Sequence, residues 1–282
     1  MTVPWVRDRK RSRGAEPLVM VTAYDTPGSR IADRAGVDIV LVGDSVANTV
    51  LGYQDTLSVT ISDMVHHVAA VARARPHCLV VADMPWLSYH LSIEDAVRNA
   101  ASLIRAGAEA IKLEGGLNRV RVVEAIVDAE IPVMGHLGLT PQSVHAMGGY
   151  RVQAKSTAAA EQLLQGARAL AAAGCFSVVL EGVPDVVGSE VTGALEIPTI
   201  GIGAGSSCDG QVLVFHDLLG LLEGSSPKFV RRYAELGDLA VNAIAQYADD
   251  VRAGRFPGEE ESYHGSDELR EAFGRQEPGL LT

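Results

Sequence analysis

Carboxyl groups stand at the ends of several short apolar runs in this 282-residue chain. The acids in such positions are Asp44, Asp83, Glu114 and Glu181. Gathering several carboxylates in one buried place is unfavourable unless a cation or a proton offsets their charge. If the fold brings these acids together, two kinds of chemistry are available: a divalent cation bound by oxygen ligands, or a carboxyl group that exchanges a proton with a substrate.

Asp44 and Asp83 follow consecutive apolar runs, Ile39–Val42 and Leu79–Ala82. Mg²⁺ suits two such ligands because it keeps several waters and commonly binds one or two carboxylates together with substrate oxygens. No histidine or cysteine has the spacing of a zinc site. We therefore predict Mg²⁺ at Asp44 and Asp83, with the alternative that either aspartate caps the turn that follows it.

Three further polar groups accompany the aspartates. Lys112 and Glu114 lie two residues apart in one run, so their side chains share a face. We expect Lys112 to pair with a substrate carboxylate and Glu114 to support the metal; the alternative is an internal ion pair. His136, after the next run, is a candidate to assist a proton transfer or, alternatively, a satisfied structural group. Glu181 ends an almost purely apolar run and suits a general base, unless it is a salt-bridged structural glutamate.

Eight short apolar runs alternate with longer stretches of helical character. Most runs are rich in Val, Ile and Leu without polar alternation, which is typical of strands buried on both faces. The predicted strands are Leu18–Thr22, Ile39–Val42, Leu79–Ala82, Ala110–Leu113, Pro132–Gly135, Ser177–Leu180, Thr199–Ile202 and Gln211–Phe215. The predicted helices are Thr26–Ala35, Ser62–Arg73, Ser92–Ala106, Asn118–Ala129, Thr157–Ala173 and Pro184–Leu195. This order predicts an α/β fold, a single (β/α)8 TIM barrel, whose strand ends converge on one mouth where active sites lie.

The barrel domain is predicted to span residues 1–264. Its basic N-terminal segment is expected to be a solvated terminus. The link after Ile202 is too short for a full helix, whereas Ser226–Gly254 is predicted to be helical. The polar tail, residues 265–282, is expected to be loosely ordered, with weak helical character over Asp267–Gly274. Gly201–Gly205 resembles an anion-binding loop, although glycines also serve tight turns and close packing.

Composition narrows the partners. The chain has 24 Lys and Arg against 35 Asp and Glu, a net charge of −11 that argues against nucleic acid and an anionic membrane surface. No run approaches the roughly 18 apolar residues of a membrane span, and no apolar signal segment follows the basic N-terminus. Cys78, Cys175 and Cys208 are scattered, as expected of buried thiols in a reducing compartment. We expect a cytoplasmic protein that acts on small molecules.

Short motifs occur in order along residues 15–264. They are Val19–Asp25 (VMVTAYD), Leu41–Ser45 (LVGDS), Ala82–Pro85 (ADMP), Lys112–Gly116 (KLEGG), Gly135–Ser143 (GHLGLTPQS), Gly148–Tyr150 (GGY), Gly201–Gly205 (GIGAG) and Pro257–Glu260 (PGEE). The set resembles one family, ketopantoate hydroxymethyltransferase (3-methyl-2-oxobutanoate hydroxymethyltransferase) of pantothenate biosynthesis. GHLGLTPQS and LVGDS are highly specific to it.

The resemblance implies a TIM barrel of the phosphoenolpyruvate/pyruvate type that binds one Mg²⁺ per subunit. It implies Asp44, Asp83 and Glu114 as metal ligands, and it adds Ser45 and Lys112 to the two aspartates as binding residues for the 2-oxo acid. Glu181 matches the family's proton acceptor. The implied one-carbon donor is 5,10-methylenetetrahydrofolate, and the implied assembly is a homodecamer.

Two stretches depart from the family pattern. Val46-Ala47-Asn48 stands where the family commonly has Leu-Gly-Met, and Gly182 stands where it commonly has cysteine. The first change borders the expected substrate pocket. Two other functions stay open: a Mg²⁺-dependent 2-oxo acid lyase on the same kind of barrel, and a barrel that binds a metabolite without catalysis. Lyases of that kind often use a loop cysteine, and none of the cysteines here ends a strand.

Overall fold

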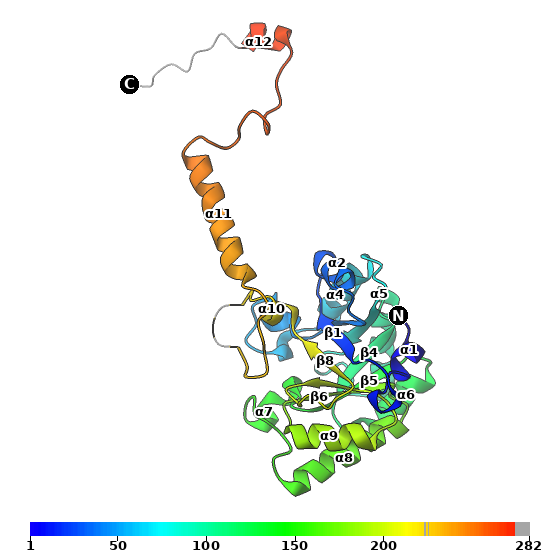
Figure 1. Ribbon diagram of the computed structural model, residues 1–282. Coiled ribbons are helices and arrows are strands. Elements are labelled where there is room, and N and C mark those ends of the chain that lie inside the picture. Colours follow the sequence, from blue (N-terminus) through cyan, green and yellow to red (C-terminus); the bar gives the residue numbers. More distant parts are fainter. Residues whose placement is uncertain (223, 225, 274–282) are drawn as a thin grey trace. The chain divides into compact units, whose positions relative to one another are not determined.

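Eight parallel strands close into a barrel in the computed structural model, which describes residues 1–222, 224 and 226–273 (Figure 1). The strands are β1 (Leu18–Thr22), β2 (Ile39–Val42), β3 (Leu79–Asp83), β4 (Ala110–Glu114), β5 (Val133–Gly138), β6 (Ser177–Glu181), β7 (Thr199–Ile202) and β8 (Gly210–Leu213). Each pairs with the next along the chain, and β8 pairs with β1. The predicted TIM barrel is confirmed. β3, β4 and β6 each extend one residue past the predicted run, so Asp83, Glu114 and Glu181 are strand residues.

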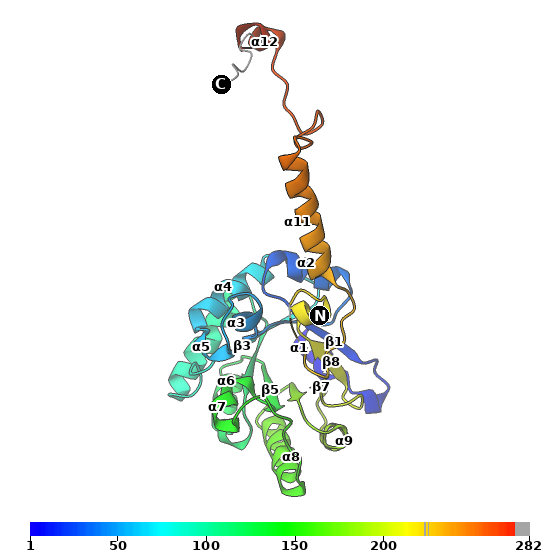
Figure 2. The same ribbon diagram turned by 90° about the vertical axis from the view of Figure 1, so that its left-hand side faces the viewer.

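Longer helices connect the strands, and several of them are seen outside the barrel in Figure 2. They are α2 (Thr26–Arg34), α4 (Ile61–Ala72), α5 (Ile93–Ala106), α6 (Val120–Asp128), α8 (Thr157–Ala172) and α9 (Asp185–Ala194). The sequence placed each of them to within two residues at either end. Local capping explains the accuracy: Thr60 and Asp63 form a capping box at the start of α4, and the Ser92 hydroxyl accepts the N–H of Asp95 at the start of α5.

Short helical segments complete the connections. They are α1 (Val3–Arg7), η1 (Arg11–Arg13), α3 (Val46–Thr49), η2 (Thr56–Ser58), η3 (Leu117–Arg119), η4 (Pro141–Ser143), α7 (Val144–Met147) and α10 (Phe215–Leu218). The link between β7 and β8 contains no helix, as its length predicted. The helix that directly follows β8 is the four-residue α10.

The barrel interior changes from apolar to charged along the strands. Buried apolar residues from every strand fill it, among them Leu79 and Val81 of β3 and Ala110 of β4. Side chains alternate between the two faces of a strand, so every second residue continues along the same inner face. The residues that continue these inner rows at the carboxyl ends are Asp83 on β3, Lys112 and Glu114 on β4, His136 on β5 and Glu181 on β6. Strand alternation therefore points the predicted chemistry into the barrel.

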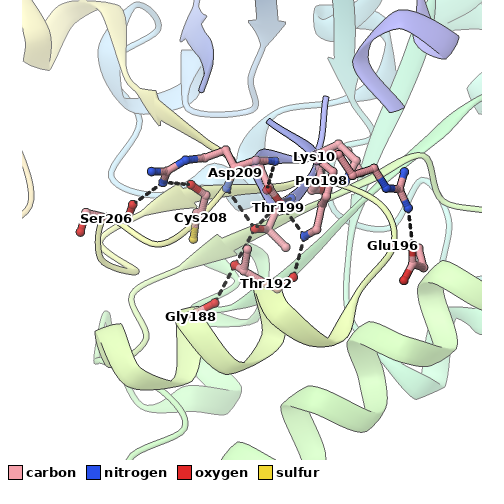
Figure 3. A network of polar contacts seen from close by, with 12 residues as sticks. Lys10, Gly188, Thr192, Glu196, Pro198, Thr199, Ser206, Cys208 and Asp209 are labelled. Carbon is pink, nitrogen blue, oxygen red and sulfur yellow. Dashed lines mark hydrogen bonds and ion pairs between the residues drawn. The ribbon is translucent and has the colours of Figure 1, made fainter. Parts of the chain in front are cut away.

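The N-terminal segment binds at the opposite, amino-terminal end of the strands (Figure 3). Lys10 Nζ donates to Asp209 Oδ2 at 2.7 Å and to the carbonyl of Thr192 at 2.6 Å. The backbone N–H of Arg11 donates to Asp209 Oδ1, and that of Thr199, the first residue of β7, donates to Oδ2, both at 2.9 Å. Lys10 is only 3% exposed, so the expectation of a solvated terminus is wrong for this residue, while Arg7 is exposed.

Residues 235–282 form a second unit, separate from the unit of residues 1–234 that contains the barrel. It holds α11 (Leu236–Arg252) and α12 (Asp267–Phe273), neither of which has a buried residue. The predicted helical stretch Ser226–Gly254 is correct for α11 and wrong for its described residues before Leu236. The barrel domain predicted over residues 1–264 includes α11, which the structure assigns to the second unit. Part of the predicted loose tail, residues 274–282, lies outside the described residues.

All three cysteines are free and buried, as predicted. Burial raises the pKa of the Cys78 thiol to about 11 and that of Cys175 to about 12. Burial also raises the pKa of Cys208. No helix within the described ranges is both long and apolar enough to cross a membrane.

Candidate active site

The barrel mouth gathers all the predicted site residues. Asp44, Asp83, Lys112, Glu114 and His136 are each 5% exposed or less, and the Glu181 side chain is 16% exposed. They come from the carboxyl ends of β2 to β6, which are neighbours in the barrel. Closure of the sheet thus brings distant residues into one site. Asp44 and Glu181, the furthest apart in the chain, are separated by 137 positions.

An ion pair joins neighbouring strands at the base of this site. Lys112 Nζ lies 2.8 Å from Asp83 Oδ1, and the two residues are register partners of β4 and β3. The backbone N–H of Asp44 donates to the other oxygen, Asp83 Oδ2, at 2.9 Å. The internal ion pair considered for Lys112 therefore exists, but with Asp83 rather than Glu114 as the closest acid.

His136 lies between two acids. Its Nδ1 is 3.3 Å from Glu114 Oε1, and its Nε2 is 3.3 Å from Glu181 Oε2. Burial and the charge of Lys112 oppose protonation, but contacts with Glu114 and Glu181 outweigh both and raise the pKa of His136 to about 9. Since the ring is then an imidazolium near pH 7, the Lys112 ammonium 3.2 Å from Nδ1 is a like-charged neighbour rather than a hydrogen-bond donor.

Burial at the mouth disfavours the ionised form of two aspartates. Burial raises the pKa of Asp44 well above its ordinary value, and the charges of Asp83 and Glu114 raise it further, while Lys112 opposes them. Burial also raises the pKa of Asp83, against the pull of Lys112. A bound cation would oppose this effect, because it favours the ionised form of each carboxyl.

One buried oxygen is more open to such a cation than the others. Glu114 Oε1 makes no directed hydrogen bond and lies 3.3 Å from His136, whereas Asp83 Oδ1 already pairs with Lys112 at 2.8 Å. In the described part of the chain, no three His, Cys, Asp or Glu side chains are arranged to hold a metal ion on their own. Mg²⁺ does not need three, because waters and substrate oxygens complete its shell. The donor chemistry thus fits Mg²⁺ with a bound oxo acid, and it does not fit a closed zinc site.

Gln142 and Tyr89 also belong to the site, although no role was assigned to them from the sequence. Gln142 Nε2 donates to Asp44 Oδ2 at 2.8 Å and to the carbonyl of Met84 at 3.0 Å. The backbone N–H of Gln142 donates to Glu114 Oε2 at 3.0 Å, and the Tyr89 hydroxyl donates to Gln142 Oε1 at 2.6 Å. Gln142 stands within GHLGLTPQS, so the motif that carried the resemblance contained the signal for it.

The residues around Ser45 show whether Asp44 caps the following helix and which of the residues that depart from the family pattern face the pocket. Ser45 Oγ is 2.8 Å from the hydroxyl of Tyr24. Asp44 accepts from Gln142, and α3 has Ser45 at its N-cap without a side-chain cap, so Asp44 does not cap that helix. Val46 and Ala47 are fully buried, whereas Asn48 lines the pocket and donates to the carbonyl of Tyr53 at 3.0 Å. Of this departure from the family pattern, only Asn48 faces the pocket.

Gly182 and the glycine-rich stretch serve backbone geometry. Gly182 has φ +54°, and a Cβ there would lie 3.2 Å from Leu139 Cβ, which a cysteine would have to accommodate. Gly203 has φ +65°, and a Cβ there would lie 2.8 Å from the ring of Phe229. The structure thus supports close packing at Gly203, the second of the two readings of the glycine-rich stretch.

A pocket of about 950 Å³ opens at the mouth. Asp44, Ser45, Asp83, Lys112, Glu114, His136 and Glu181 all line it. Its other lining residues include Tyr150, Arg151, Lys228 and Phe229. Drug-sized ligands occupy pockets of roughly 300–1,000 Å³, so this one has room for more than a small oxo acid.

Comparison with known proteins agrees with this geometry. Residues 1–259 match the family described as Ketopantoate hydroxymethyltransferase. The 3-methyl-2-oxobutanoate hydroxymethyltransferase 2 of Bradyrhizobium diazoefficiens is 55% identical over 265 residues, which cover 94% of this chain and 90% of that protein.

Solved structures share the fold at low identity. One is 2,3-dimethylmalate lyase, a PEP mutase/isocitrate lyase superfamily member, with a TM-score of 0.58, 17% identity and coverage of 97% of this chain and 95% of that one. Another is phosphonopyruvate hydrolase in complex with oxalate and Mg²⁺, with a TM-score of 0.58, 14% identity and the same coverage. A closed parallel barrel with acids at its mouth, together with these likenesses, defines the fold class: a TIM barrel. Within that class, the matches in sequence are decisive. The chain belongs to the ketopantoate hydroxymethyltransferase family.

Proposed function

We propose that this chain transfers a hydroxymethyl group from 5,10-methylenetetrahydrofolate to 3-methyl-2-oxobutanoate and so forms 2-dehydropantoate (ketopantoate), the first committed step of pantothenate biosynthesis. The observation that carries the proposal is the buried cluster of Asp44, Asp83 and Glu114 beside Lys112 and Glu181, in which Glu114 Oε1 makes no directed hydrogen bond. Membership of the family supports the choice of substrate. A Mg²⁺ ion held by Asp44 and Asp83, with Glu114 beside them, would polarise the 2-oxo group and make the C3 proton more acidic.

The protein's own residues divide the remaining work. Lys112 holds the carboxylate of the 2-oxo acid, and Ser45 adds a hydroxyl beside it. Glu181 removes the proton from C3, and His136 keeps that carboxylate in place because Nε2 is 3.3 Å from Oε2. Carbon C3 then bonds to the methylene carbon of the donor as one of its two carbon–nitrogen bonds breaks. Water displaces the second nitrogen from that carbon and supplies the hydroxyl group. The proton from C3 and the remaining proton of water end on the two nitrogens, which releases tetrahydrofolate.

The outer part of the pocket suits the folate donor. A 2-oxo acid of five carbons leaves most of about 950 Å³ unfilled. The cationic side chains of Arg151 and Lys228 line this part, and no ion pair joins either of them to an acid among residues 1–222, 224 and 226–273. The tail of a folate carries carboxylates, which such cations attract. Phe229, which packs on Gly203, supplies an aromatic surface nearby.

The lyase alternative is not favoured by the cysteines. Cys78, Cys175 and Cys208 are all buried, and none is among the residues that line the pocket. Two further expectations stay predictions: a homodecameric assembly, which the resemblance implies, and a cytoplasmic location, which the cysteines and the composition suggested.

The decisive experiment is the formation of ketopantoate from 3-methyl-2-oxobutanoate and 5,10-methylenetetrahydrofolate, with Mg²⁺ and with EDTA. We expect product with Mg²⁺ and its loss with EDTA. No product from folded protein with Mg²⁺ present would overturn the function. Exchange of the C3 proton into D₂O, which needs no folate, separates loss of proton abstraction from loss of the donor.

A further inference from the structure

A glutamine from the loop after β5 links acids that belong to different strands. We infer that Gln142, oriented by Tyr89, is a positioning residue that sets the separation of Asp44 and Glu114 and thereby the affinity of the mouth for a divalent cation. The inference rests on the proposed function only for the choice of Mg²⁺. No step of the proposed reaction uses either residue.

The hydrogen-bond inventory fixes which way the Gln142 amide points. The Tyr89 hydroxyl accepts the N–H of Glu114 at 3.2 Å, so its single hydrogen is free to go to Gln142 Oε1, 2.6 Å away. Gln142 Nε2 then carries both of its hydrogens on the other side, where Asp44 Oδ2 and the carbonyl of Met84 accept them. The Tyr89 hydroxyl and both atoms of the Gln142 amide have partners, so the amide has no reason to flip.

This arrangement leaves each acid with one oxygen committed and one available. Asp44 Oδ2 is held by the side chain of Gln142, and Glu114 Oε2 is held by its backbone N–H. Glu114 Oε1 is among the buried atoms without a directed hydrogen bond. Both acids also lie on the pocket wall. One residue thus orients carboxylates from the ends of β2 and β4, as outer partners of metal ligands commonly do.

Asp83 provides an internal contrast. The backbone N–H of Asp44 and the ammonium of Lys112 hold it, and Gln142 does not touch it. Loss of the Gln142 side chain should therefore free Asp44 while leaving the pair of Lys112 and Asp83 in place. Tyr89 is a gentler probe, because removing its hydroxyl leaves the buried ring in position and takes away two contacts, the one that fixes the Gln142 amide and the one that accepts the N–H of Glu114.

The test measures Mn²⁺, a spectroscopic substitute for Mg²⁺, by electron paramagnetic resonance titration of the full chain with and without 3-methyl-2-oxobutanoate. Outer partners of metal sites are worth about 10–100-fold in metal affinity. We expect the dissociation constant to rise about 10-fold in Tyr89→Phe and about 100-fold in Gln142→Leu. Gln153→Leu is the matched control, since among the described residues that side chain donates only to the carbonyl of Arg151 in its own loop.

Thermal unfolding separates positioning from packing. A lower melting temperature with unchanged Mn²⁺ affinity in both Tyr89→Phe and Gln142→Leu would show that the pair only packs the loop, and it would overturn the inference. If Gln142→Leu does not fold, the affinity of Tyr89→Phe decides alone. Failure of the proposed function is a separate result, namely no ketopantoate from the unsubstituted protein, whatever its variants do with Mn²⁺.

Discussion

The barrel buries charge at both ends, and the two clusters are built differently. At the amino-terminal end, both oxygens of Asp209 accept hydrogen bonds, and Lys10 donates to two acceptors. At the mouth, Lys112 holds Asp83 Oδ1 at 2.8 Å, but Glu114 Oε1 and His136 Nε2 are buried without a directed hydrogen bond and have only ion-pair contacts of 3.3 Å. The first cluster satisfies itself, whereas the second keeps bonding capacity that a ligand can use.

The difference follows from the energetics of buried charge. A buried ion pair survives only where further hydrogen bonds complete it, and removing one partner leaves an unpaired charge that costs several kcal/mol. A cluster with unmet bonds is a local cost to the fold, so it persists where binding or catalysis uses it. Both clusters are buried and charged, so neither property separates the structural cluster from the functional one. What differs is how completely the hydrogen bonds of each cluster are formed. Substitutions at the mouth should therefore change chemistry, and substitutions at the other end should change stability.

The largest expected effect is at Glu181. Glu181→Gln keeps the shape of the side chain but removes the base, so exchange of the C3 proton of 3-methyl-2-oxobutanoate into D₂O should slow by about 1,000-fold, within the roughly 10²–10⁴ range of general-base catalysis. Proton NMR of the substrate measures the rate. The melting temperature should stay close to that of the parent. Exchange at the parental rate would remove Glu181 as the base.

The next effect is at the other end of the barrel. Lys10→Met leaves Asp209 buried without its cation, and the free energy of unfolding should fall by about 3–5 kcal/mol. Urea titration measures it, with the exposed Arg168→Met of α8 as the control. The C3 exchange rate per folded molecule should stay within about twofold of the parent. A large loss of exchange in folded Lys10→Met would break the division between the two ends.

The smallest effect concerns Asp44 in metal-free protein. The pKa of Asp44 is raised in the fold, so the stability that its protonation provides is fully present below the unfolded pKa and is lost as pH rises through the folded pKa. Asp44→Asn removes this loss and can still offer an oxygen to Gln142. With EDTA at pH 7, the variant should be more stable than the parent, because it has no buried carboxyl to ionise. Calorimetry should show the gain shrinking towards pH 4; a gain independent of pH would contradict the cause given.

The residues of the barrel mouth could be predicted from the sequence because the patterns that indicate them are local. Apolar runs defined the strands, and alternation then placed Asp83, Lys112 and Glu114 on the inner face, whatever the rest of the chain did. Gln142 and Lys10 carry no such signal, because their partners Asp44 and Asp209 lie 98 and 199 positions away. Neither contact follows from spacing, since each depends on how a loop or terminus folds back on the barrel. The helix predicted from Ser226 was wrong for the described residues before Leu236, because helix propensity is a weak local signal that the rest of the fold can override.

The three natural cysteines are buried, so they should react little with thiol reagents in the folded protein. A maleimide reacts with thiolate, and the raised pKa values of Cys78, Cys175 and Cys208 leave little of it near pH 7. A single cysteine introduced at an exposed position, such as Val241→Cys on α11, should therefore take a fluorescent label with the three natural thiols left in place. Such a label would report on the surroundings of α11 without a cysteine-free background.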